Sequence, residues 1–196
     1  MALAALCSAQ RLSAQETIIA LRHAEKPAAG LGQLTCRGLN RALALPGVLI
    51  PRFGKPDAIY APDPAVEVSD RSNTLYSYVR PLITIEPTAI ELGMPVNAQI
   101  GYNDIAKLQA ELTSPAFANA RIFVAWEHGF LNRFAVQMLA SFGEDPAKVP
   151  DWPNDDYDRI YVFTIQQGRG KPSLQFKIEH EDLNHSLSDT CPGSAR

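Results

Sequence analysis

The chain has 196 residues, of which 46% are hydrophobic and 20% charged, and its formal net charge is −3. These values are typical of a globular protein with one domain and a full hydrophobic core. A slightly acidic chain offers no broad basic surface, so no nucleic acid is expected as a partner. No apolar run is long enough to span a bilayer.

The chain starts with a short apolar stretch, Met-Ala-Leu-Ala-Ala-Leu-Cys-Ser-Ala, that ends in small residues. It resembles the end of a secretory signal, although a positively charged start is missing. We therefore expect a signal-like leader over residues 1–15 and a single domain over residues 16–196. The corresponding localisation is secreted or periplasmic, and a cytoplasmic protein with a plain leader is the alternative.

An apolar, β-prone run at Thr17–Leu21 leads directly into Arg22-His23-Ala24-Glu25. Ligands of open α/β sheets bind at the carboxyl ends of the strands, which is where this Arg-His pair would lie. A guanidinium group suits phosphate oxygens, and a neutral imidazole is a nucleophile near pH 7. Arg22 and His23 are therefore candidates for attack on a bound phosphoryl group.

Thr35 can cap a helix in which Leu39 and Leu43 recur at helical spacing. A short strand is expected at Asp57–Tyr60, and a proline-rich loop follows it.

Arg80 precedes Pro81, and proline suits the first position of a helix. Arg80 would then lie at a helix start, where free N–H groups and the helix dipole favour an anion. The competing arginine is Arg71, which could pair with the neighbouring Asp70 at the surface. Pro87 predicts that the helix breaks or restarts there.

The remaining elements alternate between strands and helices. Expected are a short strand at Met94–Asn97, a helix at Asp104–Leu112, a buried strand at Arg121–Trp126, a helix at Phe130–Phe142, a loop at Asp151–Asp156, and a hairpin of Arg159–Ile165 with Ser173–Glu179. This alternation predicts an α/β protein, a three-layer α/β/α sandwich with a mostly parallel sheet and an antiparallel hairpin at its edge.

Taken in order, these motifs resemble the histidine phosphatase superfamily, also called the phosphoglycerate-mutase-like fold. The matching segments are Leu21–Glu25, Leu34–Ala42, Arg80 with Thr84 four residues on, and His128-Gly129. The resemblance covers roughly residues 17–179. It implies a nucleophilic His23 and a phosphate pocket made by Arg22, Arg80 and His128, and its threonine favours Arg80 over Arg71.

The activity that this resemblance implies is metal-independent hydrolysis of a phosphomonoester. His23 would attack phosphorus, and water would hydrolyse the resulting phosphohistidine. The leaving oxygen needs a proton, which calls for a carboxylic acid in the pocket. Glu127 is the first candidate, Asp104 the second and Glu25 the third. The expected partner is a phosphorylated small molecule or a phosphoprotein, with no cofactor and no metal.

Three alternatives remain open. A phosphomutase would need a closed site that keeps water out, and no large lid is evident in the sequence. A catalytically weak protein could keep the fold and bind a phosphate ligand without turnover. A metal-dependent hydrolase could use His180 and His185, although these two fit a polar surface tail better.

Cys36 and Cys191 form an even pair if the leader is removed. In an oxidising compartment they could bond and tie the tail to the first helix. The expectation is nevertheless a buried thiol and a loose terminal one, without a bond.

Overall fold

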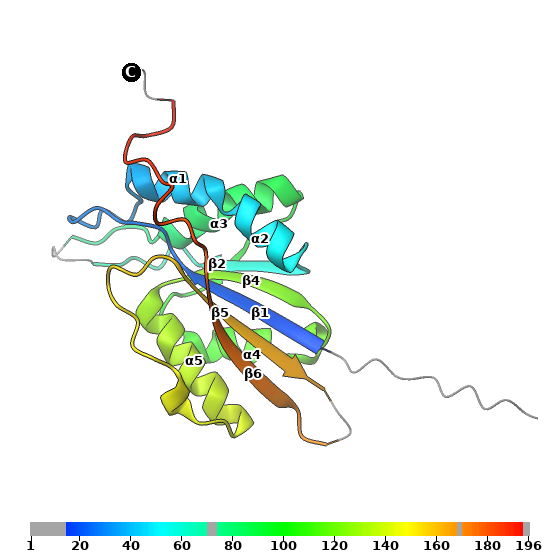
Figure 1. Ribbon diagram of the computed structural model, residues 1–196. Helices are drawn as coiled ribbons and strands as arrows, with labels where there is room; N and C mark the ends of the chain where they lie inside the picture. Colours follow the sequence, from blue (N-terminus) through cyan, green and yellow to red (C-terminus); the bar gives the residue numbers. More distant parts are fainter. Residues whose placement is uncertain (1–14, 70–73, 168–169, 194–196) are drawn as a thin grey trace, which may run out of the picture.

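The computed structural model describes residues 15–69, 74–167 and 170–193. Within these residues, six strands form one sheet in the order β3-β2-β4-β1-β5-β6 (Figure 1). The strands are β1 (Gln15–Arg22), β2 (Ala58–Pro62), β3 (Asn97–Ile100), β4 (Arg121–Trp126), β5 (Arg159–Gln166) and β6 (Ser173–His180). The helices are α1 (Cys36–Ala44), α2 (Pro46–Phe53), α3 (Arg80–Leu92), α4 (Ile105–Leu112) and α5 (His128–Phe142), with short 3-10 turns at Pro115–Phe117 and Pro146–Lys148.

The sheet is parallel in its first half and antiparallel at its other edge. Strand β4 pairs in parallel with both β1 and β2, and β2 pairs in parallel with β3. Strand β5 runs antiparallel to β1 and to β6. The expected hairpin at the edge is confirmed, and the expected mostly parallel sheet is confirmed only for the strands β1 to β4.

Helices cover both faces of the sheet, which confirms the three-layer sandwich. Figure 1 shows α1, α2 and α3 on one face and α4 and α5 on the other. Successive side chains of a strand point to opposite faces. In β1, Ile19 and Leu21 accordingly pack with the α1–α3 core, and Ile18 and Ala20 pack with the α4–α5 core.

Two sequence-based expectations for the elements were wrong, and one helix was not predicted. No element was predicted at α2, whose sequence holds two prolines and a glycine; Pro46 occupies the first turn, and Pro46 and Leu49 are buried. Helix α3 runs through Pro87 without a break, since packing of Thr84, Ile85, Thr88 and Ala89 offsets a cost of about 3 kcal/mol for an interior proline. The third strand lies at Asn97–Ile100, three residues after its expected position.

The tail after β6 lies along α1 (Figure 1). Cys36 and Cys191 form a disulfide with a Cα–Cα distance of 4.4 Å, so the expectation of two separate thiols was wrong. The side chain of Asn40 donates hydrogen bonds to the carbonyl oxygens of Ser188 and Thr190, both at 2.8 Å. These contacts between the Asn40 side chain and the tail backbone hold the tail close to α1, where the disulfide forms. The sequence alone could not show this proximity.

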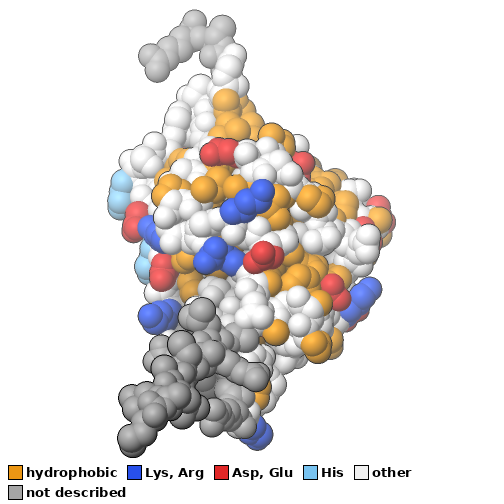
Figure 2. Space-filling model, turned by 90° about the vertical axis from the view of Figure 1, so that its right-hand side faces the viewer, with side chains coloured by type: hydrophobic (Ala, Val, Ile, Leu, Met, Phe, Trp, Pro, Cys, Tyr) orange, Lys and Arg blue, Asp and Glu red, His pale blue; other side chains and the backbone are white. Residues whose placement is uncertain are grey.

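The expected leader lies outside the described residues except for Gln15, where β1 begins. Arg71 also lies outside them. On the face shown in Figure 2, basic and acidic side chains are interspersed with hydrophobic ones. No helix in the part of the chain that the structure describes has the length and hydrophobicity to cross a bilayer.

Candidate active site

The carboxyl ends of β1 and β4 bring both histidines of the sequence motifs to one edge of the sheet. Arg22 is the last residue of β1 and pairs with Trp126, the last residue of β4. The amide of His23 donates a hydrogen bond of 2.7 Å to the carbonyl oxygen of Trp126. Glu127 and His128 follow immediately and start α5. Side chains that are about a hundred residues apart in the sequence therefore meet at this edge.

Arg80 reaches the same place from the first position of α3. Its side chain is 2% exposed, and its guanidinium carbon lies 4.8 Å from the ring centroid of Tyr78. Buried Thr84 links this helix to the His23 loop, because its hydroxyl donates to the carbonyl oxygen of Arg80 at 2.8 Å and accepts from the amide of Ala24 at 2.9 Å. Thr84 thus fixes the distance between Arg80 and the loop that carries His23.

His23 is held as a neutral imidazole with one free nitrogen. Its Nδ1 lies 2.8 Å from the carbonyl oxygen of Ala24. Because a carbonyl oxygen only accepts, Nδ1 carries the hydrogen and Nε2 keeps its lone pair. Burial, followed by the positive charges of Arg80 and Arg22, lowers the pKa of His23 to about 3. The arrangement leaves Nε2 with an unprotonated lone pair across the neutral pH range.

A pocket of about 290 Å³ opens in front of these groups. It is lined by Arg22, His23, Lys26, Val68, Tyr78, Arg80, Tyr102, Glu127, His128 and Phe130. Five of the lining residues are the site residues expected from the sequence. The pocket combines two buried arginines with the amino ends of α3 and α5, and these features together favour an anion.

Glu127 and His128 form a close pair at the start of α5. The Nδ1 atom of His128 lies 2.5 Å from Oε1 of Glu127, whose Oε2 accepts from the amide of Phe130 at 2.9 Å. Burial acts to raise the pKa of Glu127, but His128 and the amides of Gly129 and Phe130 outweigh it and lower the pKa to about 2. Glu127 is therefore ionised near pH 7 in the ligand-free protein.

The loop at Asp151–Asp156 closes over Arg22. The Nη1 atom of Arg22 donates to the carbonyl oxygens of Asn154 and Asp156 at 2.9 Å and of Pro153 at 3.3 Å. The ring of Tyr157 stacks on the guanidinium at 3.9 Å. These contacts fix one edge of the guanidinium and aim the rest of it at the pocket.

The other two carboxylates considered as proton donors lie elsewhere. Asp104 caps α4 by accepting from the amide of Lys107 at 3.2 Å, and its side chain is exposed. Glu25 points away from the pocket and binds Arg41. Of the three candidates, only Glu127 lines the pocket.

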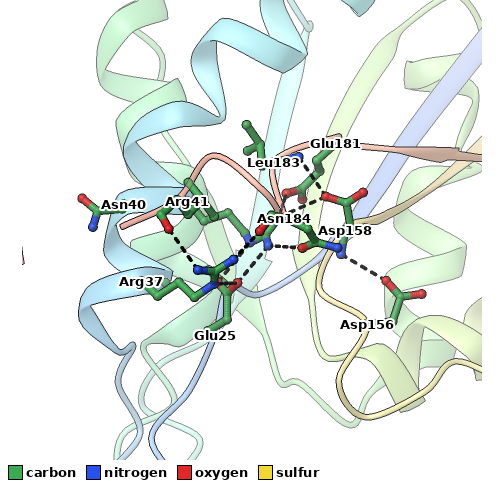
Figure 3. Close-up of polar contacts among 12 residues, drawn as sticks. Glu25, Arg37, Asn40, Arg41, Asp156, Asp158, Glu181, Leu183 and Asn184 are labelled. Carbon is green, nitrogen blue, oxygen red and sulfur yellow. Dashed lines mark hydrogen bonds and ion pairs between the residues drawn. The ribbon is translucent and has the colours of Figure 1, made fainter. Parts of the chain in front are cut away.

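Arg41 is the centre of a buried charged cluster beside the site (Figure 3). It holds Glu25 through two hydrogen bonds of 2.8 and 3.0 Å, Glu181 at 2.6 Å and Asn184 at 2.6 Å, and Asp158 lies at 3.4 Å. Burial, together with the charges of Asp158 and Glu25, raises the pKa of Glu181 to about 8 against the opposing charge of Arg41. The cluster joins the His23 loop to α1, β5 and the tail.

Helix α1 also supports the His23 loop through its backbone. The amide of Thr35 donates to the carbonyl oxygen of Glu25 at 2.9 Å, and the Thr35 hydroxyl caps the helix at Gly38. A Cβ at Gly38 would lie 2.4 Å from that same carbonyl oxygen. Glycine is therefore required for the loop to lie this close to the helix.

Some site residues were not found from the sequence. Asn154 places its Oδ1 atom 3.0 Å from Nε2 of His128, and it lies in a loop without any distinguishing pattern. Tyr102 follows the end of β3, and Phe130 lies in the first turn of α5. The position of Tyr102 after a parallel strand was the one signal that could have placed it at this edge.

The histidines of the tail lie apart from the pocket. His180 is the last residue of β6 and His185 is exposed in the tail. Among the described residues, no group of three His, Cys, Asp or Glu side chains is arranged to hold a metal ion.

No family model matches this chain, and no curated protein matches its sequence. Solved structures do match its fold. A protein assigned as the phosphohistidine phosphatase SixA of Nakamurella multipartitia aligns with a TM-score of 0.56 and 16% identity, over 85% of this chain and 96% of that one.

Two further solved structures also match the fold of this chain. The mycobacterial glucosyl-3-phosphoglycerate phosphatase aligns with a TM-score of 0.54 and 13% identity, over 83% of this chain and 97% of that one. The phosphoglycerate mutase of Plasmodium falciparum aligns with a TM-score of 0.52 and 12% identity, over 82% and 89%. The expected phosphoglycerate-mutase-like fold is thereby confirmed.

Proposed function

We propose that this protein is a histidine phosphatase that hydrolyses phosphomonoesters through a phosphohistidine on His23. The observation that carries the proposal is the state of His23, a buried neutral imidazole whose Nε2 lone pair is free. A nucleophile in this state, in a pocket with two buried arginines, suits attack on a phosphoryl group.

In the proposed reaction, Arg22, Arg80 and His128 hold the phosphoryl oxygens and neutralise their charge in the transition state. A bond forms between Nε2 of His23 and phosphorus while the ester P–O bond breaks, and the leaving oxygen departs with the electron pair and takes a proton from water. Water then attacks the phosphohistidine, releases phosphate and restores His23. Every cation in this scheme is a side chain of the pocket.

The state of Glu127 favours a second candidate, a protein that binds a phosphate ligand without turnover. Because Glu127 is ionised in the ligand-free pocket, a proton for a poor leaving group is not ready there. This candidate predicts phosphate binding without release of phosphate from any ester.

We also propose that the protein works in an oxidising compartment, secreted or periplasmic. The Cys36–Cys191 disulfide supports this, because such bonds persist mainly outside the reducing cytosol.

The test is phosphate release from an aryl phosphate with a chelator present. We expect the parent protein to be active and His23→Ala to lose at least roughly 10³-fold in kcat. His185→Ala, a change at an exposed histidine of the tail, is the matched control and should match the parent. Equal activity of His23→Ala and the parent would overturn the nucleophile, and phosphate binding without turnover would favour the second candidate.

A further inference from the structure

Aromatic rings form a continuous wall on one side of the candidate active site. The rings of Tyr78 and Tyr102 meet edge to face with centroids 5.1 Å apart, and those of Tyr102 and Phe130 do so at 5.3 Å. The Tyr78 ring also lies 6.2 Å from the ring of His23. Tyr78 is fully buried, whereas Tyr102 and Phe130 are half-buried. The wall therefore starts at the nucleophile and runs outward toward solvent.

The rings of the wall are held in place from behind. The indole N–H of Trp126 donates to the carbonyl oxygen of Tyr102 at 2.8 Å, which fixes the turn that carries this ring. The guanidinium carbon of Arg133 lies 4.9 Å from the centroid of Phe130. A wall fixed in this way loses little conformational entropy when it binds a flat group.

Among the described residues, the outer part of the pocket combines aromatic rings with a few polar groups. Beyond the groups proposed to hold the phosphoryl oxygens, the described lining residues are Lys26, Val68 and the three rings. The carboxylate of Glu127 is already engaged by His128 and by the amide of Phe130. A sugar or polyol bound here would have the ammonium of Lys26 and the tyrosine hydroxyls as polar partners, whereas an aromatic group could pack against the rings of Tyr102 and Phe130.

The acidity of the leaving group also favours an aromatic substrate. A phenol ionises near pH 10, as tyrosine does, whereas an aliphatic alcohol is closer to water, at about 15.7. A phenolate can therefore depart without a proton donor, and an alkoxide cannot. An ionised Glu127 suits the first leaving group and not the second.

We propose that the site acts on aryl phosphomonoesters, with the aromatic ring of the leaving group packed against Tyr102 and Phe130. This substrate class rests on the proposed phosphatase function. The bond from Nε2 of His23 to phosphorus forms as the bond from phosphorus to the aryl oxygen breaks. The phenolate departs with the electron pair and takes its proton from water.

The test is the binding of two phosphonates that cannot be hydrolysed, so that leaving-group reactivity plays no part. Titration calorimetry with phenylphosphonate and methylphosphonate measures how much the phenyl ring of the ligand contributes to the binding affinity. We expect phenylphosphonate to bind about tenfold more tightly. In Phe130→Ala and in Tyr102→Leu the ratio should fall to about twofold, and in Phe142→Ala, which removes a ring at the other end of α5, the tenfold ratio should persist.

The rates of hydrolysis of two phosphomonoesters provide a second test. Phenyl phosphate should be hydrolysed roughly 10²-fold or more faster than glycerol phosphate, because the latter needs general-acid assistance. A short peptide with phosphotyrosine, compared with phenyl phosphate, shows whether the aryl group comes from a protein or from a small molecule; hydrolysis of either one supports the proposal.

Equal binding of the two phosphonates, or faster hydrolysis of glycerol phosphate, would overturn the aryl preference and leave the proposed phosphatase function intact. Failure of both phosphonates and of inorganic phosphate to bind would instead contradict the phosphate pocket itself. Two variants, Phe130→Ala and Tyr102→Leu, are used so that one remains if the other does not fold. The ratio of the two phosphonate affinities in the parent protein is measured independently of both.

Discussion

At the level of single residues, the proposed function requires a neutral His23. Burial makes the protonated form of the imidazole unfavourable, and the two neighbouring arginines add to this effect. The hydrogen bond from Nδ1 to the carbonyl oxygen of Ala24 then selects which nitrogen is free. The same arginines that would bind a phosphoryl group therefore also help to keep the proposed nucleophile neutral.

This account predicts the titration of His23. In the folded protein its ring should stay neutral down to about pH 4, because its pKa lies near 3. In the unfolded chain it should titrate near 6.5. The unfolded state then binds the extra proton as the pH falls from 6.5 to 3, so this group's contribution to stability falls with it. NMR of the ring nitrogens in folded and urea-unfolded protein measures both values, and a midpoint between 6 and 7 in the folded state would contradict the account.

At the level of helices and strands, the C-terminal tail packs along α1 and is bonded to it. Besides the disulfide, Arg37 donates to the carbonyl oxygen of Leu187 at 3.0 Å, and Arg41 reaches Asn184 at 2.6 Å. Helix α1 in turn contacts the loop after His23 through Thr35 and Arg41, which both bind Glu25. The tail therefore contacts α1, and α1 contacts the loop that carries His23, so a loss of tail contacts can affect the position of this loop.

Removal of the disulfide should lower stability. The bond joins residues 155 positions apart in the sequence, so it restricts the unfolded chain over a long loop. Cys191→Ser and Cys36→Ser should each cost about 2–4 kcal/mol, which lowers Tm by roughly 4–16 °C for a chain of this size. Thermal unfolding with and without a reductant supplies the control. The reductant should lower the Tm of the parent to that of the variants and leave the variants unchanged; a parent insensitive to reductant would show that the bond contributes nothing.

Elements were predictable from the sequence where local signals agreed, as in the strand at Arg121–Trp126, whose bounds are those of β4. The predicted break at Pro87 was wrong because packing outweighed propensity, and α2 was not predicted. Pro87 does not interrupt α3, and the prolines of α2 do not prevent a helix, because both helices bury apolar side chains against the sheet. Asn154 and the disulfide depend on how distant loops meet, and single-sequence patterns carry no information on that.

At the scale of the whole molecule, the proposed substrate and the protein have charge of the same sign. The net charge is −3, and on the face in Figure 2 charges of both signs are mixed. Attraction of an anion must therefore be local, from the buried arginines and the amino ends of α3 and α5. A pocket of this kind stabilises the whole fold when it is filled, because an anion that binds only the native state shifts the unfolding equilibrium.

Inorganic phosphate should accordingly raise the Tm of the protein. At a concentration of about 100 times Kd the gain is about 2.7 kcal/mol, which corresponds to roughly 5–11 °C. Chloride at the same ionic strength is the control for a general salt effect. Arg80→Ala should abolish the phosphate-specific shift, whereas Arg52→Ala, a change on α2 away from the pocket, should keep it. An equal shift in both variants would mean that phosphate binds elsewhere.

Trapping of the covalent intermediate is the most direct test of His23 as the nucleophile. After rapid mixing with an aryl phosphate and quenching in base, mass spectrometry of the peptides locates the phosphoryl group, and ³¹P NMR identifies the substituted nitrogen. The account predicts a phosphoryl group on Nε2 of His23, because Nδ1 is held by the carbonyl oxygen of Ala24. Turnover with phosphorylation of another residue, or with no phosphorylated residue under conditions where the intermediate should accumulate, would contradict it.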